Sequence, residues 1–562
     1  MGRVRNMDET ALVKIFRRLC QGSKESVQSG LELDEFDNYM HVERPIDKAV
    51  RDTMDEIRVE GGGILFLVGS AGDGKSHMIS TLKKEYTDFE FRNDASESPW
   101  PNVESIDALK IFLNNYKDVT LHTTTTKMLV AINMGKLSAF IDDDEVQIEF
   151  SEIANCAKTL FDEDNLRHKE TNRVRIVSFA NHQIFELFPE CKDFIYPVDS
   201  FFIKKVLCKI TDDSCGNLFR TAFNNSKPIG EDFDPCYINY QLLSIPAIQD
   251  TIIKIIIEAI IRFKLMLTPR ELFDFIYRIV IPDTYATFDL TKDFFKSLLP
   301  NLLFEGGENK IMKCLAMLDP LKYGSIEHND YLAELFTSVA IPEEECFSIL
   351  KSELHPRFFE ILDEYYKNNR YNIGDISKLL FRMKHLMKYH SESVEYRSFL
   401  SILCGYYDND EDRLFLIYET IQRSIPHLYG SYTDKQNLVP LDIQGKEYKM
   451  FVSCDNLRPA PQEAVPFDIN NRNKFVVEID SFWKVNTPVP PLKVEYQLYE
   501  YLCKIQCGKL AQMDDRNHNL LFYGFISNLV QQTDFKEKVI ILTSDNQQLT
   551  LSRTFGKKVT LK

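Results

Sequence analysis

The feature that most constrains the fold is an uninterrupted apolar run, residues 64–68, that leads directly into a glycine-rich segment. A run without polar alternation is typical of a strand buried on both faces, and such strands form parallel sheets covered by helices. After the glycines, apolar residues recur at helical spacing from Met78 to Tyr86. The order of strand, loop and helix therefore predicts an α/β domain with a parallel sheet.

The glycine-rich segment carries a phosphate-binding motif. Its sequence, GSAGDGKS, fits the pattern G-x-x-x-x-G-K-[ST]. Glycines let successive backbone N–H groups point into one concavity, beside the positive end of the following helix. Lys75 would reach the β- and γ-phosphates, and the Ser76 hydroxyl would bind Mg²⁺. The predicted site for ATP and Mg²⁺ consists of Gly69, Ser70, Ala71, Gly72, Asp73, Gly74, Lys75 and Ser76.

The rest of the chain divides by its apolar spacing. Further strands are expected at residues 89–91, 128–132 and 174–179, separated by helical patterns long enough for crossover connections. The spacing is then helical until a proline-rich segment, which precedes two strand-like runs around a helix. We expect an α/β P-loop NTPase domain with a helical lid, a mostly helical middle domain and a small α/β C-terminal domain. The expected units are a helical lead-in at 1–60, the α/β core at 61–200, a lid-like subdomain at 201–290, a helical domain at 291–455 and the tail at 468–562.

Charge limits the partners of the chain. Its 67 Lys and Arg against 84 Asp and Glu leave a net charge of −17, which excludes wholesale coating of nucleic acid. Contact with DNA would need a local basic patch or a basic partner. One candidate patch lies between residues 365 and 390, although charge runs on helices are more commonly solvated faces. It contains Lys367, Arg370, Lys378, Arg382, Lys384 and Lys388 against Asp375.

The lengths of the apolar runs bear on where in the cell the protein is expected. None approaches the roughly 20 residues needed to span a bilayer, and the most apolar one, residues 252–261, carries Lys254 and Glu258. We expect that run to form a buried helix. The first residues lack the apolar segment of a secretory signal, which indicates a cytoplasmic protein. Its 12 cysteines include no C-x-x-C pair, so reduced thiols are expected rather than zinc modules.

Hydrolysis of a bound nucleotide would need a carboxylate at the end of a second apolar strand. The strand at 128–132 is followed by Asn133, which could orient a water molecule but adds no charge. Asp94 follows the strand at 89–91 and is the candidate catalytic acid and metal ligand, with a turn or helix-cap role as the alternative.

Two more polar residues are candidates for contact with the phosphates. Arg270 lies near the start of a helix after the long apolar run, where a lid would bring its guanidinium to the nucleotide. A surface arginine near the end of its own helix is the alternative. Asn181 closes the strand at 174–179 and would sense the γ-phosphate, unless it serves only the turn.

A third set of residues has the types found in nuclease centres. Asp442, Glu447 and Lys449 resemble the acid and Glu-x-Lys arrangement of such centres. Only four residues separate the two acids, which favours a hairpin turn over two separated metal ligands. We therefore do not expect nuclease activity in this chain.

Four strings, HVERPID, GSAGDGKSH, FRNDASES and LVAINMGKL, followed by a helical middle and a short tail, resemble the DptF family of bacterial DNA phosphorothioation-dependent restriction proteins. The resemblance is strongest over the first 200 residues. It implies a defence system that spares DNA carrying sulfur in place of a phosphate oxygen and attacks DNA without this mark. It also implies partner subunits, one of them a helicase-like ATPase, with DNA reached through the complex.

The resemblance carries over the phosphate loop and the segment formed by Asn93 and Asp94, but it assigns no catalytic acid. Two functions follow as expectations. The first is an ATP-binding and ATP-hydrolysing subunit of the restriction complex. The second is a scaffold that binds nucleotide without turnover and assembles the partners, which Asn133 favours because it supplies no charge. The oligomeric state and the choice of ATP over GTP are left open.

Overall fold

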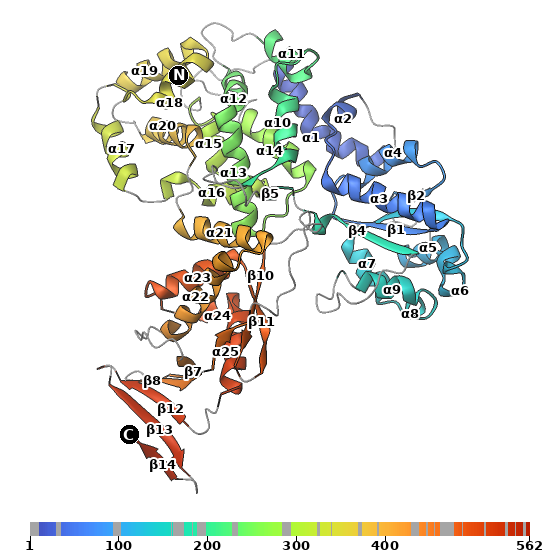
Figure 1. Ribbon diagram of the computed structural model, residues 1–562. Helices are drawn as coiled ribbons and strands as arrows, with labels where there is room; N and C mark the ends of the chain where they lie inside the picture. The colour runs from blue at the N-terminus through green and yellow to red at the C-terminus, as the bar shows by residue number, and fades with distance from the viewer. Residues whose placement is uncertain are drawn as a thin grey trace.

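The fold is that of a computed structural model, shown in Figure 1. It places an α/β sheet domain beside a large helical region, and the C-terminal strands lie at the far end of the helical region in this view. The structure describes residues 10–29, 35–93, 103–158, 160, 173–182, 184–187, 198–226, 234–283, 294–322, 326–338, 340–368, 374–389, 393–428, 438–444, 448–454, 456–460, 477–485, 487–510, 513–533, 538–543, 545, 547–554 and 558–562.

The N-terminal sheet is parallel throughout, with the strand order β2-β3-β1-β4. All four strands lie where the apolar runs predict them. The central strand β1 is buried along its whole length, as expected for a parallel sheet between two helical layers. The strands are β1 (Gly63–Val68), β2 (Glu90–Arg92), β3 (Lys127–Ile132) and β4 (Val174–Ser178).

Helices cover both faces of this sheet. Alternate residues of β1 supply the two cores: Ile64 and Phe66 pack against α5, α7 and α9, and Leu65 packs against α3 and α4. The sheet domain is therefore a three-layer α/β unit. Its helices are α3 (Pro45–Glu60), α4 (Lys75–Glu85), α5 (Ser105–Phe112), α6 (Asp118–Leu121), α7 (Met134–Ile141), α8 (Asp144–Glu149) and α9 (Ser151–Lys158).

The expected lead-in at residues 1–60 is divided between two bodies. Helix α1 (Ala11–Ser29) packs against α11 (Leu218–Asn225) and α14 (Pro269–Val280) of the helical region, whereas α3 packs on β1 and β4. The short α2 (Glu35–Met40) comes between them in the sequence. Helix α1 thus belongs to the helical region and α3 to the sheet domain.

The helical region forms one body rather than a lid and a separate domain. Helix α13, which contains the apolar run 252–261 and is buried as expected, contacts both α16 and α20 across the boundary expected at 290. A single core joins these helices. They are α10 (Phe201–Thr211), α12 (Pro235–Leu243), α13 (Pro246–Phe263), α15 (Leu299–Phe304), α16 (Lys310–Met317), α17 (Ile326–Thr337), α18 (Glu345–Glu353), α19 (Pro356–Asn368), α20 (Gly374–Met387), α21 (Val394–Asp408) and α22 (Glu411–His427), with the small pair β5 (Glu186–Leu187) and β6 (Val198–Asp199) beside α13.

The C-terminal part differs from the expected small α/β domain, because its sheets are antiparallel. Residues 438–453, which we expected to belong to the helical domain, form two strands of a sheet ordered β14-β13-β12-β8-β7. A second sheet is ordered β11-β10-β9. The elements are β7 (Leu438–Gln444), β8 (Tyr448–Ser453), β9 (Arg458–Pro459), β10 (Ile479–Lys484), β11 (Pro488–Val494), α23 (Tyr496–Gln506), α24 (Met513–His518), α25 (Leu520–Gln531), β12 (Lys538–Thr543), β13 (Gln548–Thr554) and β14 (Lys558–Leu561).

Among the described residues, no helix combines the length and the apolar character that crossing a membrane requires. Helix α13 contains 18 residues but carries charged side chains within its span.

Candidate functional site

The phosphate loop, residues 69–76, connects the end of β1 to the start of α4. Gly72 and Gly74 have φ angles of 94° and 91°, in the left-handed region that favours glycine. A side chain at Gly69 would place its Cβ 2.7 Å from both a carboxylate oxygen of Asp73 and the ring of Phe179. Two of the three glycines in the loop are therefore required by their backbone conformation and the third by a close contact.

The Lys75 side chain folds back over the phosphate loop. Its Nζ donates hydrogen bonds to the carbonyl oxygens of Gly69 and Ser70, each at 2.7 Å. Lys75 and Ser76 are the first two residues of α4, so both stand at the positive end of that helix. The ammonium group, the hydroxyl and the helix N-terminus are thus collected in one place, as the binding of a phosphate chain requires.

Arg44, which the sequence reasoning missed, holds the loop from outside. Its Nη1 donates to the carbonyl oxygen of Asp73 at 2.7 Å, and its guanidinium stacks 5.1 Å from the centroid of the Phe179 ring. The Asp73 carboxylate accepts a hydrogen bond from the Ser70 N–H, and burial raises the pKa of Asp73. An available signal was the position of Arg44 directly before Pro45, which starts α3.

A cavity of about 290 Å³, here called the phosphate cavity, opens beside the loop. Lys75, Ser76 and Arg270 line it together. The Cβ of Arg270 lies 3.3 Å from the position that a Cβ on Gly72 would occupy. Arg270 reaches this place because α14 begins at a capping box, in which the Thr268 hydroxyl accepts from the N–H of Glu271. Arg270 thus lies beside the loop, and the contact of its guanidinium with nucleotide phosphates stays a prediction.

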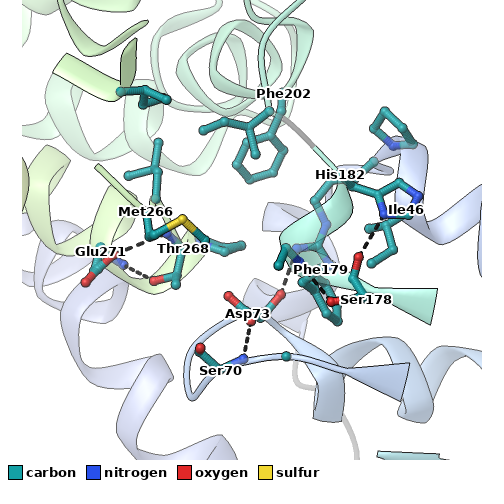
Figure 2. A pocket seen from close by; sticks show the side chains of 18 of the residues that line it. Ile46, Ser70, Asp73, Ser178, Phe179, His182, Phe202, Met266, Thr268 and Glu271 are labelled. Atoms are coloured by element: carbon teal, nitrogen blue, oxygen red, sulfur yellow. Dashed lines mark hydrogen bonds between the residues drawn. The ribbon is translucent and has the colours of Figure 1, made fainter. Parts of the chain in front are cut away.

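A second cavity of about 280 Å³, the interdomain cavity, shares Ser70 and Ala71 with the first. Figure 2 shows its walls: Met266 and Glu271 come from the helical region and face His182 from the sheet domain. The phosphate loop therefore lies between two bodies that both contact the same space. The helical region thus occupies the place expected for a helical lid, but it does so as part of a large body and not as a small separate subdomain.

The other predicted residues stand less close to the phosphate cavity. Asn133 lines neither cavity, because its side-chain oxygen accepts from the Lys136 N–H at 2.8 Å and caps α7. Asn181 is exposed at the end of a short 3₁₀ turn and also lines neither cavity. Asp94 lies outside the described residues, but Asn93, directly before it, lines the phosphate cavity.

Two histidines and one acid of this cavity were not foreseen. His41 Nδ1 lies 2.7 Å from His77 Nε2, and the two rings stack with their centroids 4.8 Å apart. Burial lowers the pKa of both rings, that of His77 to about 4. Asp37 is the carboxylate among the described residues that line the phosphate cavity. His77 directly follows the motif, a position at which the sequence offered a signal.

Acidic side chains pair with part of the basic run at 365–390 in the residues that the structure describes. Arg382 is buried and bonds Asp319 and Asn301, each at 2.7 Å. Lys384 pairs with Glu344 and Lys367 with Asp363, both at 2.5 Å. Arg370 lies outside the described residues. Three of the six basic side chains are therefore paired with acids, Lys367 within its own helix and Arg382 and Lys384 with acids distant in the sequence. Lys378 and Lys388 are exposed, and their contact with DNA stays a prediction.

Two of the three suspected nuclease residues lie on neighbouring antiparallel strands. Asp442 is on β7 and Lys449 is on β8, where Lys449 pairs with Gln444, and Glu447 falls outside the described residues. Within the described part of the chain, no group of three His, Cys, Asp or Glu side chains could hold a metal ion.

The chain matches no family model, no curated protein and no solved structure. Its function therefore has to be argued from the geometry of the phosphate loop and its two cavities.

Proposed function

We propose that the chain binds ATP with Mg²⁺ in the phosphate cavity and hydrolyses it, as a subunit of a bacterial phosphorothioation-dependent restriction complex. The observation that carries the nucleotide assignment is the loop of residues 69–76. It joins a buried parallel strand to a helix, and its Lys75 and Ser76 line one cavity together with Arg270 of α14. The residue types and their placement fit a triphosphate with its metal ion.

The residues of the loop would divide the binding between them. Backbone N–H groups at the start of α4 and the Lys75 ammonium would hold the phosphate oxygens. Ser76 would hold Mg²⁺, which supplies charge neutralisation between the phosphates when it is bound. Lys75 already makes two hydrogen bonds to neutral carbonyl oxygens, so a phosphate can add to this arrangement without displacing an acid from those bonds.

Arg270 gives a route from nucleotide state to conformation. It belongs to α14 of the helical region but lies against the loop of the sheet domain. A contact that Arg270 makes with the γ-phosphate would exist with ATP and be absent with ADP. Such a difference in affinity is what any ligand-driven change requires. Hydrolysis would therefore alter how the helical region and the sheet domain hold together.

The restriction assignment rests on the resemblance of the strings around residues 41–47, 69–77, 91–98 and 129–137 to the DptF family. Three of the described parts of these strings converge in the structure. Arg44 bonds the loop, and Asn93 lines the same cavity as Lys75. In this proposal the nucleotide state governs the assembly or activity of partner subunits, including a helicase-like ATPase, on DNA that lacks the sulfur mark.

The test of nucleotide binding uses Lys75→Ala, with Lys84→Ala at the exposed end of the same helix as control. Removing charge-assisted hydrogen bonds costs about 1.5–3 kcal/mol, or roughly 10- to 100-fold in affinity. We expect that loss for ATP with Mg²⁺ in titration calorimetry, with the control unchanged. Cells that carry the system with Lys75→Ala should also lose protection against unmarked DNA. Unchanged ATP affinity in Lys75→Ala would refute the nucleotide assignment.

A scaffold that binds ATP without turnover is the second candidate. It is favoured by the cap role of Asn133 at the end of β3 and by the presence of only Asp37 as an acid among the described residues lining the phosphate cavity. Steady-state phosphate release separates the two functions. Purified protein would be assayed alone, with DNA and with candidate partners. An ATPase releases phosphate in at least one condition, and a scaffold releases none in all three.

A further inference from the structure

The phosphate cavity continues beyond the loop into walls that are largely aromatic and apolar, with the Arg18 guanidinium 4.4 Å from the centroid of the Phe36 ring. Met40 and Phe36 of α2, Phe273 of α14 and Phe202 of α10 line this part. Phe36 and Met40 are nearly buried, at 3 % and 5 % exposure. Aromatic and apolar walls with a few polar groups are what proteins use to enclose the flat ring of a small ligand. A site for inorganic phosphate alone would need no such wall.

The polar side chains in these walls include Arg18, Asp37 and, as a stacked pair, the rings of His41 and His77. The contact of 2.7 Å between their nitrogens requires that one ring donates and the other accepts. Each ring therefore fixes the orientation of the other. The pair also joins two parts of the chain, because His41 precedes α3 and His77 lies in the first turn of α4. Both rings line the phosphate cavity.

The position of His77 in the sequence indicates which end of a bound nucleotide lies near the histidine pair. In a phosphate loop the lysine reaches the β- and γ-phosphates, and the N–H groups at the helix start cradle the α- and β-phosphates. His77 is two residues after Lys75, within that first turn. A nucleoside is attached at the α-phosphate, so it must continue from the helix start into the neighbouring part of the cavity, where the histidine pair and the aromatic wall lie.

We propose that the stacked pair of His41 and His77, with Phe273, holds the nucleobase. This inference rests on the proposed function and adds that the site selects nucleoside triphosphates over other polyphosphates. It also links the base to the loop. His41 lies three residues before Arg44, whose guanidinium bonds the Asp73 carbonyl in the loop. A base that orders the segment around His41 therefore helps to hold the phosphate loop in its shape.

The test compares two probes, ATP and inorganic tripolyphosphate, each with Mg²⁺, by titration calorimetry of the full chain. Wild-type protein should bind ATP at least tenfold more tightly than tripolyphosphate. His41→Ala and His77→Ala should each lose most of that difference, with tripolyphosphate affinity within about twofold of the wild type. His122→Ala, an exposed histidine paired with Glu152 in the same domain, is the control and should behave as wild type.

Each other outcome overturns the inference in a distinguishable way. If the histidine variants keep wild-type affinity for ATP, the base lies elsewhere and the nucleotide assignment stands. If their affinities for ATP and tripolyphosphate fall together, the pair only positions the loop. If wild-type protein binds neither probe, the proposed function fails as well.

A second experiment uses only wild-type protein, so it tests the inference even if the histidine variants do not fold. Photolabelling with 2-azidoadenosine triphosphate, followed by peptide mapping, should mark peptides that contain His41, His77 or Phe273. The marks should disappear with excess ATP but persist with inorganic phosphate. Competable labelling confined to other peptides would overturn the inference.

Discussion

The phosphate loop and helix α20 both hold cations in largely apolar surroundings, but their hydrogen bonds end on different partners. Two hydrogen bonds of Lys75 run to neutral carbonyl oxygens of its own loop, at the wall of a cavity. Arg382 of α20 is 4 % exposed and bonds the carboxylate of Asp319, 63 residues away in the sequence. These two bonds of Lys75 end on neutral acceptors, and the Asp73 carboxylate interacts with its charge, whereas Arg382 bonds a buried carboxylate directly.

Because of this difference, we expect the charge of Lys75 to bind a ligand and the charge of Arg382 to stabilise the fold. An anion that approaches Lys75 adds to its existing bonds. An anion that approached Arg382 would have to displace Asp319 from a buried pair, which leaves one buried charge without its partner. The four predictions below test this division, beginning with the most buried pair.

The largest effect is expected for Arg382→Ala. Removing one partner of a buried ion pair destabilises a protein by about 3–5 kcal/mol, and here Asp319 would be left buried. Urea unfolding should show this loss, whereas the exposed Lys378→Ala on the same helix should change stability by less than about 0.5 kcal/mol. If Arg382→Ala unfolds like the wild type but loses DNA or partner binding, the division between the two regions is wrong.

A smaller effect is expected for Gly72→Ala in the loop. The φ angle of 94° is strained for any residue with a Cβ, at a cost of about 1–2 kcal/mol. The new Cβ would also stand 3.3 Å from Arg270. We expect weaker ATP binding and a lower melting temperature. The control is Gly374→Ala at the start of α20, where a Cβ has nothing within 4 Å and both properties should be retained.

Arg270→Ala should weaken ATP binding by about tenfold, which corresponds to about 1.4 kcal/mol. The guanidinium is proposed to contact only the γ-phosphate, so ADP affinity should change by less than about twofold. Titration calorimetry with both nucleotides measures this split. Arg278→Ala, later in α14 and paired with Asp274, is the control. Equal losses for ATP and ADP would show that Arg270 does not distinguish nucleotide states.

The smallest effect is expected at an exposed pair in the sheet domain. The hydrogen bond from Arg58, assisted by Lys127, lowers the pKa of Asp88. A lowered folded-state pKa stabilises the protein above the unfolded value near 4 and loses that contribution as the pH falls below it. Because Asp88 is 36 % exposed, we expect only about 0.5 kcal/mol. Thermal unfolding of Asp88→Asn should therefore differ from wild type at pH 7 and converge with it near pH 2.

Local patterns were sufficient for the sheet domain, since a buried run, a glycine-rich loop and a helical period each report on neighbouring residues. The strands at 128–132 and 174–179 and the loop were predicted for this reason. The antiparallel sheet of β7, β8 and β12 was not, because it pairs Phe451 with Ile540 across about 90 residues of chain. Such pairings leave little trace in either segment alone.

In the candidate site, too, residues within a local motif could be predicted, whereas contacts between distant segments could not. Lys75, Ser76 and Arg270 were found from motif and position, whereas Arg44 and the pair of His41 and His77 were missed. The positions of Arg44 and His77 next to Pro45 and the motif were signals, but their contacts with Asp73 and His41 join segments that are 29 and 36 residues apart in the sequence. In the basic run at 365–390, the pairing of Arg382 with Asp319 and of Lys384 with Glu344 could not be predicted, because these acids are 63 and 40 residues away in the sequence.

The sequence by itself determined that a strand, a phosphate-binding loop and a helix follow one another, because backbone conformation and apolar period are properties of adjacent residues. Only the tertiary structure decided which charges face a cavity and which are neutralised, since ion pairs and cavity walls form between segments far apart in the chain. Arg270 and Arg382 are both arginines within helices. One lies against the phosphate loop and the other against Asp319, and packing alone makes that difference.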